Sequence, residues 1–158
     1  MSDPSKVDIL LVEDDPHDAE LAILALAKSQ PANGVHLVAD GEAALHYLMA
    51  AHPPDSSPRL PRLVLLDLKI PKLNGFEVLR QIRATPHSSA LAVVIWTSSG
   101  EERDIVQAYQ LGANSYVQKP MEFGRFCSTI AQLASYWLGI NRDPQKYTLP
   151  AESVGITK

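Results

Sequence analysis

Short apolar runs alternate with amphipathic segments of helical periodicity along this chain. The apolar runs cover Val7–Val12, Val35–Val38, Leu63–Leu66, Ala92–Trp96 and Ser115–Val117. The first, third and fourth runs are almost continuously apolar, which predicts strands covered by helices on both faces. The second and fifth are weaker, as is typical of edge strands. This alternation predicts an α/β fold built around a parallel sheet.

Start and stop signals predict a helix after each strand. The helices are expected from Asp15-Pro16 to about Ser29, after Gly41 to about Ala51, after Gly75 toward Pro86, from Gly100 to Gly112, and from about Met121 to Leu138. Asp15 and Pro16 combine an N-cap with a first-turn proline, and Asp18 is favourable in that first turn. We expect positive φ angles at Gly75, in a turn, and at Gly112, as a left-handed helix cap.

Two segments lie outside the alternation. Residues 52–62 hold four prolines, which predicts an extended surface loop rather than a helix or an interior strand. Residues 139–158 are mostly polar, include Pro144 and Pro150, and are too short for a second domain. We therefore expect one domain over residues 1–138 and a C-terminal tail over 139–158 without an output domain.

Bulk composition narrows the class of protein. The chain has 158 residues, of which 46% are hydrophobic, as expected for one globular domain with a core. A net charge of −4 disfavours a nucleic-acid partner. The sequence has neither an apolar run of about 18 residues, which a membrane span needs, nor the start of a signal peptide. With the single Cys127 unable to form an intrachain disulfide, we expect a cytoplasmic location and no membrane partner.

Polar groups follow four of the five apolar runs. Glu13 and Asp14 follow the first, Asp67 the third, Thr97 the fourth and Lys119 the fifth. In an open parallel sheet the carboxyl ends of the strands lie together, and ligands bind there. Carboxylates for a divalent cation, a hydroxyl and an amine would then meet, a set suited to phosphoryl transfer onto a carboxylate.

Four motifs resemble the receiver domain of two-component response regulators. They are ILLVEDD, LVLLDLKIPKLNGFEVL, VVIWTSS and NSYVQKP, and they match in type, order and spacing over roughly residues 6–138. The resemblance implies a doubly wound, flavodoxin-like (βα)5 fold with a five-stranded parallel sheet in the order 2-1-3-4-5. A narrower resemblance, to single-domain regulators paired with bacterial phytochrome kinases, rests on the proline-rich stretch before Asp67 and the ending YWLGINRDP.

The resemblance also implies roles for individual residues. Asp67 is the expected phosphoacceptor, and Thr97 and Lys119 are expected to bind phosphoryl oxygens. The expected cofactor is Mg²⁺, which prefers a few carboxylates together with water and phosphate oxygens. Asp14 and Asp67 would bind it directly, Glu13 through water, and Lys69 through its main-chain oxygen.

Three neighbouring residues carry finer expectations. Tyr116 matches the family's switching aromatic, which acts with Thr97, but it fits a half-buried edge-strand tyrosine equally well. The peptide bond between Lys119 and Pro120 is expected to be cis, as in the family motif. Asp15 matches a variable family position, and an N-cap explains it better than a ligand role.

The leading hypothesis is a phosphorylation-dependent switch. A sensor histidine kinase, for which a bacterial phytochrome is the candidate, would donate the phosphoryl group to Asp67. The protein would catalyse its own phosphorylation and slow hydrolysis without being a metabolic enzyme. Its output is expected through protein contacts, including a homodimer formed by the fourth helix, the fifth strand, the fifth helix and the tail, which carries Ile140, Tyr147 and Leu149.

Three alternatives fit less well. An aspartyl-phosphate phosphohydrolase usually carries an acid two residues after its nucleophile, where this chain has Lys69. A phosphorylation-independent binding module with the same fold is not supported by any missing group. A flavin- or dinucleotide-binding domain needs a glycine-rich first turn, but Glu13-Asp14-Asp15-Pro16 stands there and would repel a pyrophosphate.

Overall fold

Five parallel strands form the centre of the molecule. The computed structural model describes residues 6–50 and 60–147. The strands are β1 (Ile9–Val12), β2 (Val35–Val38), β3 (Leu63–Leu66), β4 (Val93–Thr97) and β5 (Ser115–Gln118). Their order is β2-β1-β3-β4-β5, so the predicted topology is confirmed.

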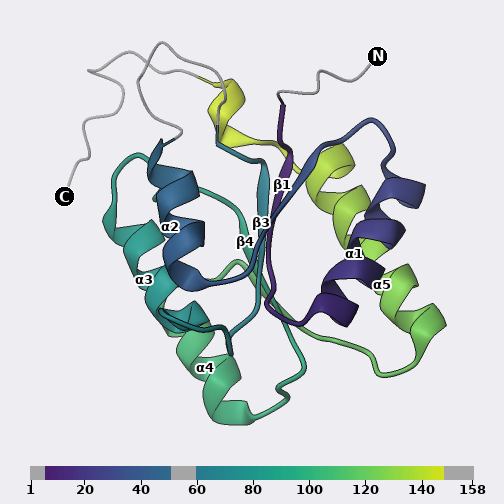
Figure 1. The fold of residues 1–158 in the computed structure, drawn as a ribbon. Coiled ribbons are helices and arrows are strands. Elements are labelled where there is room, and N and C mark those ends of the chain that lie inside the picture. The colour runs from purple at the N-terminus through teal and green to yellow at the C-terminus, as the bar shows by residue number, and fades with distance from the viewer. Residues whose placement is uncertain (1–5, 51–59, 148–158) are drawn as a thin grey trace.

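Helices cover both faces of the sheet (Figure 1). They are α1 (Pro16–Ser29), α2 (Gly41–Ala50), α3 (Gly75–Ala84), α4 (Glu102–Gln110) and α5 (Phe123–Ser135). Figure 1 shows α1 and α5 on one side of the sheet, and α2, α3 and α4 on the other. In the part of the chain that the structure describes, no helix is both long and apolar enough to cross a membrane.

Alternate residues of the central strands pack into two hydrophobic cores, one on each face of the sheet. Leu10 and Val12 of β1 pack in the core beneath α2, α3 and α4, whereas Ile9 and Leu11 pack in the core beneath α1 and α5. Every residue of β1, β3 and β4 is buried, while β2 and β5 are partly exposed. The apolar pattern therefore predicted central and edge strands correctly, because a strand covered on both faces needs apolar side chains on both.

Local signals set the helix ends. The side chain of Asp15 accepts hydrogen bonds from the backbone N–H groups of His17 and Asp18, and it caps α1 as predicted. Gly112 has a φ of 100°, also as predicted. The expectation for Gly75 is wrong, because this residue is the first of α3 and does not have a positive φ. A Cβ atom there would lie 2.3 Å from the carbonyl oxygen of Asp67, so close backbone approach explains the glycine.

The chain folds back onto the start of β3 after α5. A π-helical turn, Tyr136–Ile140, and a 3₁₀ turn, Pro144–Lys146, follow the helix. Arg62 donates a hydrogen bond of 2.6 Å from Nη2 to the carbonyl oxygen of Leu138, and its Nε lies 3.9 Å from Oδ2 of the buried Asp143. Packing thus continues beyond Leu138, and the boundary between residues 138 and 139 stays a prediction.

The proline-rich segment before β3 is only partly described. Residues 51–59 lie outside the described residues, as does Leu149 of the tail. Leu60 and Pro61, at the end of the predicted surface loop, are buried, and the Pro61 carbonyl accepts a hydrogen bond from the side chain of Gln145. The last residues of this segment therefore belong to the packed body of the domain.

Candidate phosphoacceptor and metal site

The parallel register brings the predicted polar residues to one edge of the sheet. Val12 at the end of β1 pairs with Leu66 at the end of β3. Glu13 and Asp67, the residues that follow them, therefore lie side by side just beyond the ends of these adjacent strands. The Asp67 amide donates to the Val12 carbonyl, and the Lys119 amide donates to the Thr97 carbonyl. Backbone hydrogen bonds thus fix the spacing of β1 against β3 and of β4 against β5 just where the polar side chains begin.

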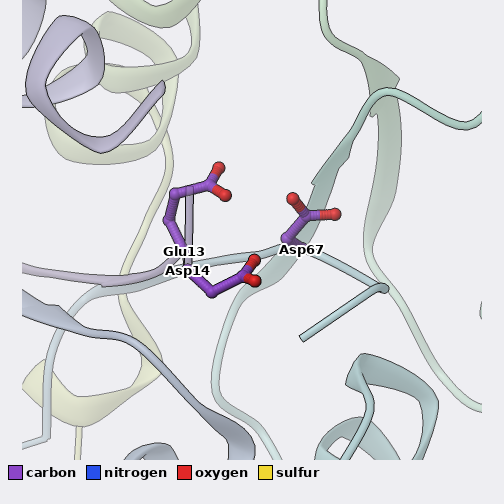
Figure 2. Close-up of side chains that lie close together, drawn as sticks. All are labelled: Glu13, Asp14 and Asp67. Carbon is purple, nitrogen blue, oxygen red and sulfur yellow. The ribbon is translucent and has the colours of Figure 1, made fainter. Parts of the chain in front are cut away.

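Three carboxylates form a compact cluster at this edge. One ligand oxygen from each of Glu13, Asp14 and Asp67 lies within 4.8 Å of the others. Figure 2 shows Glu13 and Asp14 side by side, with Asp67 across from them. Glu13 and Asp67 are buried, and Asp14 is exposed. These are hard oxygen donors with one side open to solvent, which suits a divalent cation that keeps some of its water.

The ammonium of Lys119 lies between carboxylates at the same site. Its Nζ atom is 2.6 Å from Oε1 of Glu13, 2.8 Å from Oδ2 of Asp67 and 2.9 Å from Oδ2 of Asp18. Burial alone would lower the pKa of Lys119, but its hydrogen bonds to Asp67 and Glu13 outweigh burial and raise it. The lysine is therefore held as a cation beneath the acidic cluster.

Burial acts in the opposite direction on Glu13. It raises the pKa of this carboxyl to about 7, although the hydrogen bond from Lys119 works against the rise and the charge of Asp67 adds to it. Negative charge at Glu13 is thus costly without compensation. A cation bound among the three carboxylates would supply that compensation.

Asp67 is oriented by contacts to both of its carboxylate oxygens. Oδ1 accepts a hydrogen bond of 2.7 Å from the Leu68 amide, and Oδ2 accepts the one from Lys119. The side chain remains 10% exposed, so the carboxylate reaches solvent at the edge of the sheet. A fixed and accessible carboxylate beside an ammonium is suited to attack on a phosphorus atom.

Thr97 is linked to Tyr116 through the loop after β4. The Thr97 hydroxyl oxygen accepts a 3.3 Å hydrogen bond from the Ser99 amide, and the Tyr116 hydroxyl donates one of 2.9 Å to the Ser99 carbonyl. The Ser99 hydroxyl donates to Asp104 of α4 at 2.6 Å. Burial raises the pKa of Tyr116, in the direction that favours the protonated hydroxyl. Its ring packs against the core beneath α2, α3 and α4.

A family model for the response regulator receiver domain matches residues 9–131. The chain belongs to this family. It is therefore a receiver-domain response regulator, a class of signalling component. The predicted family and fold are confirmed, and the acidic cluster lies where the four motifs meet.

Several known proteins are similar to this receiver domain. It is 40% identical over 136 residues to the probable methanogenesis regulatory protein FilR2 of Methanothrix harundinacea, covering 86% of each chain. It is 36% identical over 150 residues to the response regulator Rcp1 of a Synechocystis species, covering 95% of this chain and 97% of Rcp1.

Solved structures agree with these relatives. The phosphorylated cyanobacterial phytochrome response regulator RcpA is 33% identical, with a TM-score of 0.80 over 90% of this chain and 99% of RcpA. The Mn²⁺-bound form of Rcp1 is 34% identical, with a TM-score of 0.76 over 94% of this chain and 100% of that one. The narrower resemblance to single-domain phytochrome response regulators is therefore confirmed as a similarity.

Some residues that contact the predicted site residues were not predicted from the sequence. Asp18 was predicted only as a favourable acid in the first turn of α1, yet it contacts Lys119. Its position four residues after Asp14, at a helix start beside the strand ends, is the available signal. Ser99 and Asp104 carried no signal in sequence. Lys69 is exposed two residues after Asp67, and its ligand role and the cis Lys119–Pro120 bond stay predictions.

Proposed function

We propose that this receiver domain accepts a phosphoryl group on Asp67 from a histidine kinase and signals through contacts that depend on phosphorylation. The observation that carries the proposal is the position of the Lys119 ammonium. It lies 2.8 Å from Oδ2 of Asp67 and 2.6 Å from Oε1 of Glu13, beside the cluster that includes Asp14. Acceptor, cation ligands and a fixed positive charge thus share one edge of the sheet.

Phosphoryl transfer onto Asp67 is a substitution at phosphorus. One carboxylate oxygen of Asp67 forms the new P–O bond while the bond from phosphorus to the donor breaks, and its electron pair leaves with the donor. Lys119 and the Thr97 hydroxyl would then bind phosphoryl oxygens. Hydrolysis of the acyl phosphate by water would return Asp67 to its carboxylate and reset the switch.

The acidic cluster is the proposed site of Mg²⁺. Asp14 and Asp67 would bind it directly, Glu13 through water, and Lys69 through its main-chain oxygen. Bound Mg²⁺ would offset the negative charge that builds up on the transferring group. The compact oxygen donors of the cluster support this site, as does the Mn²⁺-bound form of the similar protein Rcp1.

The proposed output begins at Thr97 and Tyr116. A phosphoryl group carries a charge of about −1.5 to −2, which Thr97 and Lys119 are placed to bind. Since Ser99 joins Thr97 to Tyr116 through hydrogen bonds, movement of Thr97 would reach β5 and, through Asp104, α4. Both are elements of the proposed dimer face.

That face consists of α4, β5, α5 and the segment after Leu138. Large apolar side chains are exposed on it, including Val106 and Tyr109 of α4 and Tyr136 after α5. A homodimer with two-fold symmetry is the proposed assembly, since self-complementary contacts are the commonest kind. We propose that this signalling takes place in the cytoplasm, with a bacterial phytochrome as the kinase. Similarity to the phytochrome response regulator RcpA supports this kinase. The similar protein FilR2 is a probable methanogenesis regulatory protein, so the pairing with a phytochrome needs its own test.

Phosphotransfer tests the proposal with its physiological donor class. A bacterial phytochrome kinase, labelled with radioactive phosphate on its histidine, would be mixed with the receiver domain and Mg²⁺. We expect label to pass to the wild type and not to Asp67→Asn, with no transfer in chelator. Transfer to Asp67→Asn at the wild-type rate would contradict the acceptor. Transfer from an unrelated kinase alone would contradict the phytochrome pairing but support the chemistry.

A further inference from the structure

Asp18 is a third carboxylate partner of Lys119 that the chemistry described so far does not use. A lysine ammonium has three N–H donors, and here they meet Glu13, Asp67 and Asp18. Two of these acceptors belong to the acidic cluster. Asp18 lies outside it, on the first turn of α1, and contributes one more negative charge to the same ammonium.

Helix capping does not explain the direction of this side chain. Asp15 already caps α1 by accepting from the backbone N–H groups of His17 and Asp18. The Asp18 carboxylate instead has its Oδ2 2.9 Å from the Lys119 Nζ atom, which is within normal hydrogen-bond distance. An acid in a first helical turn is favourable on its own, but that effect requires no contact with a strand-end lysine.

The three carboxylate partners of Lys119 differ in their exposure to water, and therefore in the cost of losing the ammonium. The side chain of Glu13 is 1% exposed, and that of Asp67 is 10% exposed, whereas that of Asp18 is 27% exposed. Water can replace Lys119 at Asp18 but hardly at Glu13, because an unpaired buried carboxylate is strongly unfavourable. Asp18 is thus the partner that Lys119 can leave most readily.

Phosphorylation changes what Lys119 has to bind. When an oxygen of Asp67 becomes part of the acyl phosphate, the negative charge moves outward onto the phosphoryl oxygens. Asp18 keeps its full charge and continues to attract the ammonium toward α1. It also repels the new negative charge nearby.

We propose that Asp18 is a positioning residue that holds Lys119 in its unphosphorylated arrangement and, by competing for the same ammonium, weakens the hold of the domain on a phosphoryl group. This inference rests on the proposed function of Asp67. It predicts that removing the charge of Asp18 tightens binding of a phosphoryl group.

Beryllium fluoride, which stands in for the phosphoryl group on an aspartate, provides the test at saturating Mg²⁺. Its dissociation constant would be measured by titration for full-length wild type, Asp18→Asn, Asp18→Glu and Glu20→Gln. Glu20 is exposed on α1, so Glu20→Gln makes the same change in net charge as Asp18→Asn. We expect Asp18→Asn to bind about threefold to tenfold more tightly, as for a partly exposed ion pair. The other two variants should stay within about twofold of wild type.

The outcomes distinguish a failure of the proposed role of Asp18 from a failure of the proposed function of Asp67. Unchanged or weaker binding by Asp18→Asn would overturn the role of Asp18. Equally tighter binding by Glu20→Gln would show a general effect of net charge. Equally tighter binding by Asp18→Glu would show that loss of the carboxylate is not the cause. Either result would overturn the role of Asp18. If folded wild type and all variants fail to bind, the proposed function of Asp67 is wrong. Thermal melts of all four proteins establish that they are folded.

Discussion

At the scale of single residues, the site is organised by the compensation of charge at Lys119. Glu13 and Asp67 are buried at the ends of β1 and β3, where an isolated carboxylate is unfavourable. Lys119 contributes the positive charge from β5, the strand at the far edge. The ammonium of Lys119, just after β5, therefore compensates part of the negative charge of the acidic cluster.

Removal of Lys119 should destabilise the domain in chelator. Lys119→Ala leaves Glu13 and Asp67 without their cation, and we expect a loss of about 3 kcal/mol in the free energy of unfolding, measured with urea. Lys72→Ala is the matched control, because the Lys72 side chain is 59% exposed and its ammonium lies 3.7 Å from Oδ2 of Asp40. The control should lose less than about 0.5 kcal/mol. Equal losses would show that Lys119 does not compensate the cluster.

The proposed ligand role of Asp14 predicts a different effect. Mg²⁺ that binds only the folded state raises the melting temperature by mass action. Asp14→Ala should abolish this rise, yet melt at least as high as wild type in chelator, because an exposed carboxylate that repels its neighbours is gone. Asp15→Ala should lose stability with its helix cap but keep the Mg²⁺ effect. A normal Mg²⁺ shift in Asp14→Ala contradicts the proposed ligands.

Residues at strand ends were predictable, and their partners were not. Glu13, Asp67 and Lys119 follow apolar runs, and a parallel sheet necessarily brings such positions together. The contact of Asp18 with Lys119 depends on the direction of its side chain, and the contacts of Ser99 depend on the path of the loop after β4. Those features depend on the packing of α1 and of the loop after β4, which periodicity does not encode.

At the scale of elements, the strands and helices follow directly from the apolar pattern, but the contacts between distant segments do not. Arg62 and Leu138 are 76 residues apart and are joined by one hydrogen bond. Polarity predicted a tail after Leu138, whereas the structure buries Asp143 near Arg62. Gly75 shows the same limit, since the reason for its glycine is the nearby Asp67 carbonyl rather than its own φ.

Arg62 should therefore stabilise the segment after α5. Arg62→Ala leaves the Leu138 carbonyl and the buried Asp143 without this partner, and we expect a loss of about 1 to 2 kcal/mol. Amide hydrogen exchange should become faster in residues 136–147. Arg80→Ala is the control, because Arg80 is 53% exposed and pairs only with Glu77 of its own helix among the described ion pairs. Unchanged exchange in Arg62→Ala would show that Arg62 does not anchor this segment.

At the scale of the whole molecule, the site and the proposed output face are joined by β4 and β5. Thr97 ends β4, Tyr116 lies in β5, and both contact Ser99. The proposed output face, which includes α4 and α5, thus begins beside the candidate site. From the sequence, apolar side chains of the tail were named for this face. The exposed Val106 and Tyr109 of α4 were not predicted, because they also fit a helix packed on one side.

The dimer proposal predicts that one side of the domain is sensitive to charge. Tyr136→Asp places a carboxylate on the proposed face, where the native side chain is 45% exposed. We expect self-association to weaken by about tenfold or more in sedimentation over a concentration series. Leu24→Asp makes a comparable change on α1, at a side chain that is 59% exposed, and should have no effect. Purely monomeric wild type, with or without phosphorylation, would contradict the homodimer.

The most direct test of the whole account is the site of phosphorylation itself. Wild type and Asp67→Asn would be incubated with acetyl phosphate, with Mg²⁺ or with chelator, and the modified residue mapped by mass spectrometry after reductive trapping of the acyl phosphate. We predict one phosphoryl group on wild type, at Asp67, only with Mg²⁺, and none on Asp67→Asn. Modification of a residue other than Asp67, or equal labelling of Asp67→Asn, would contradict the account.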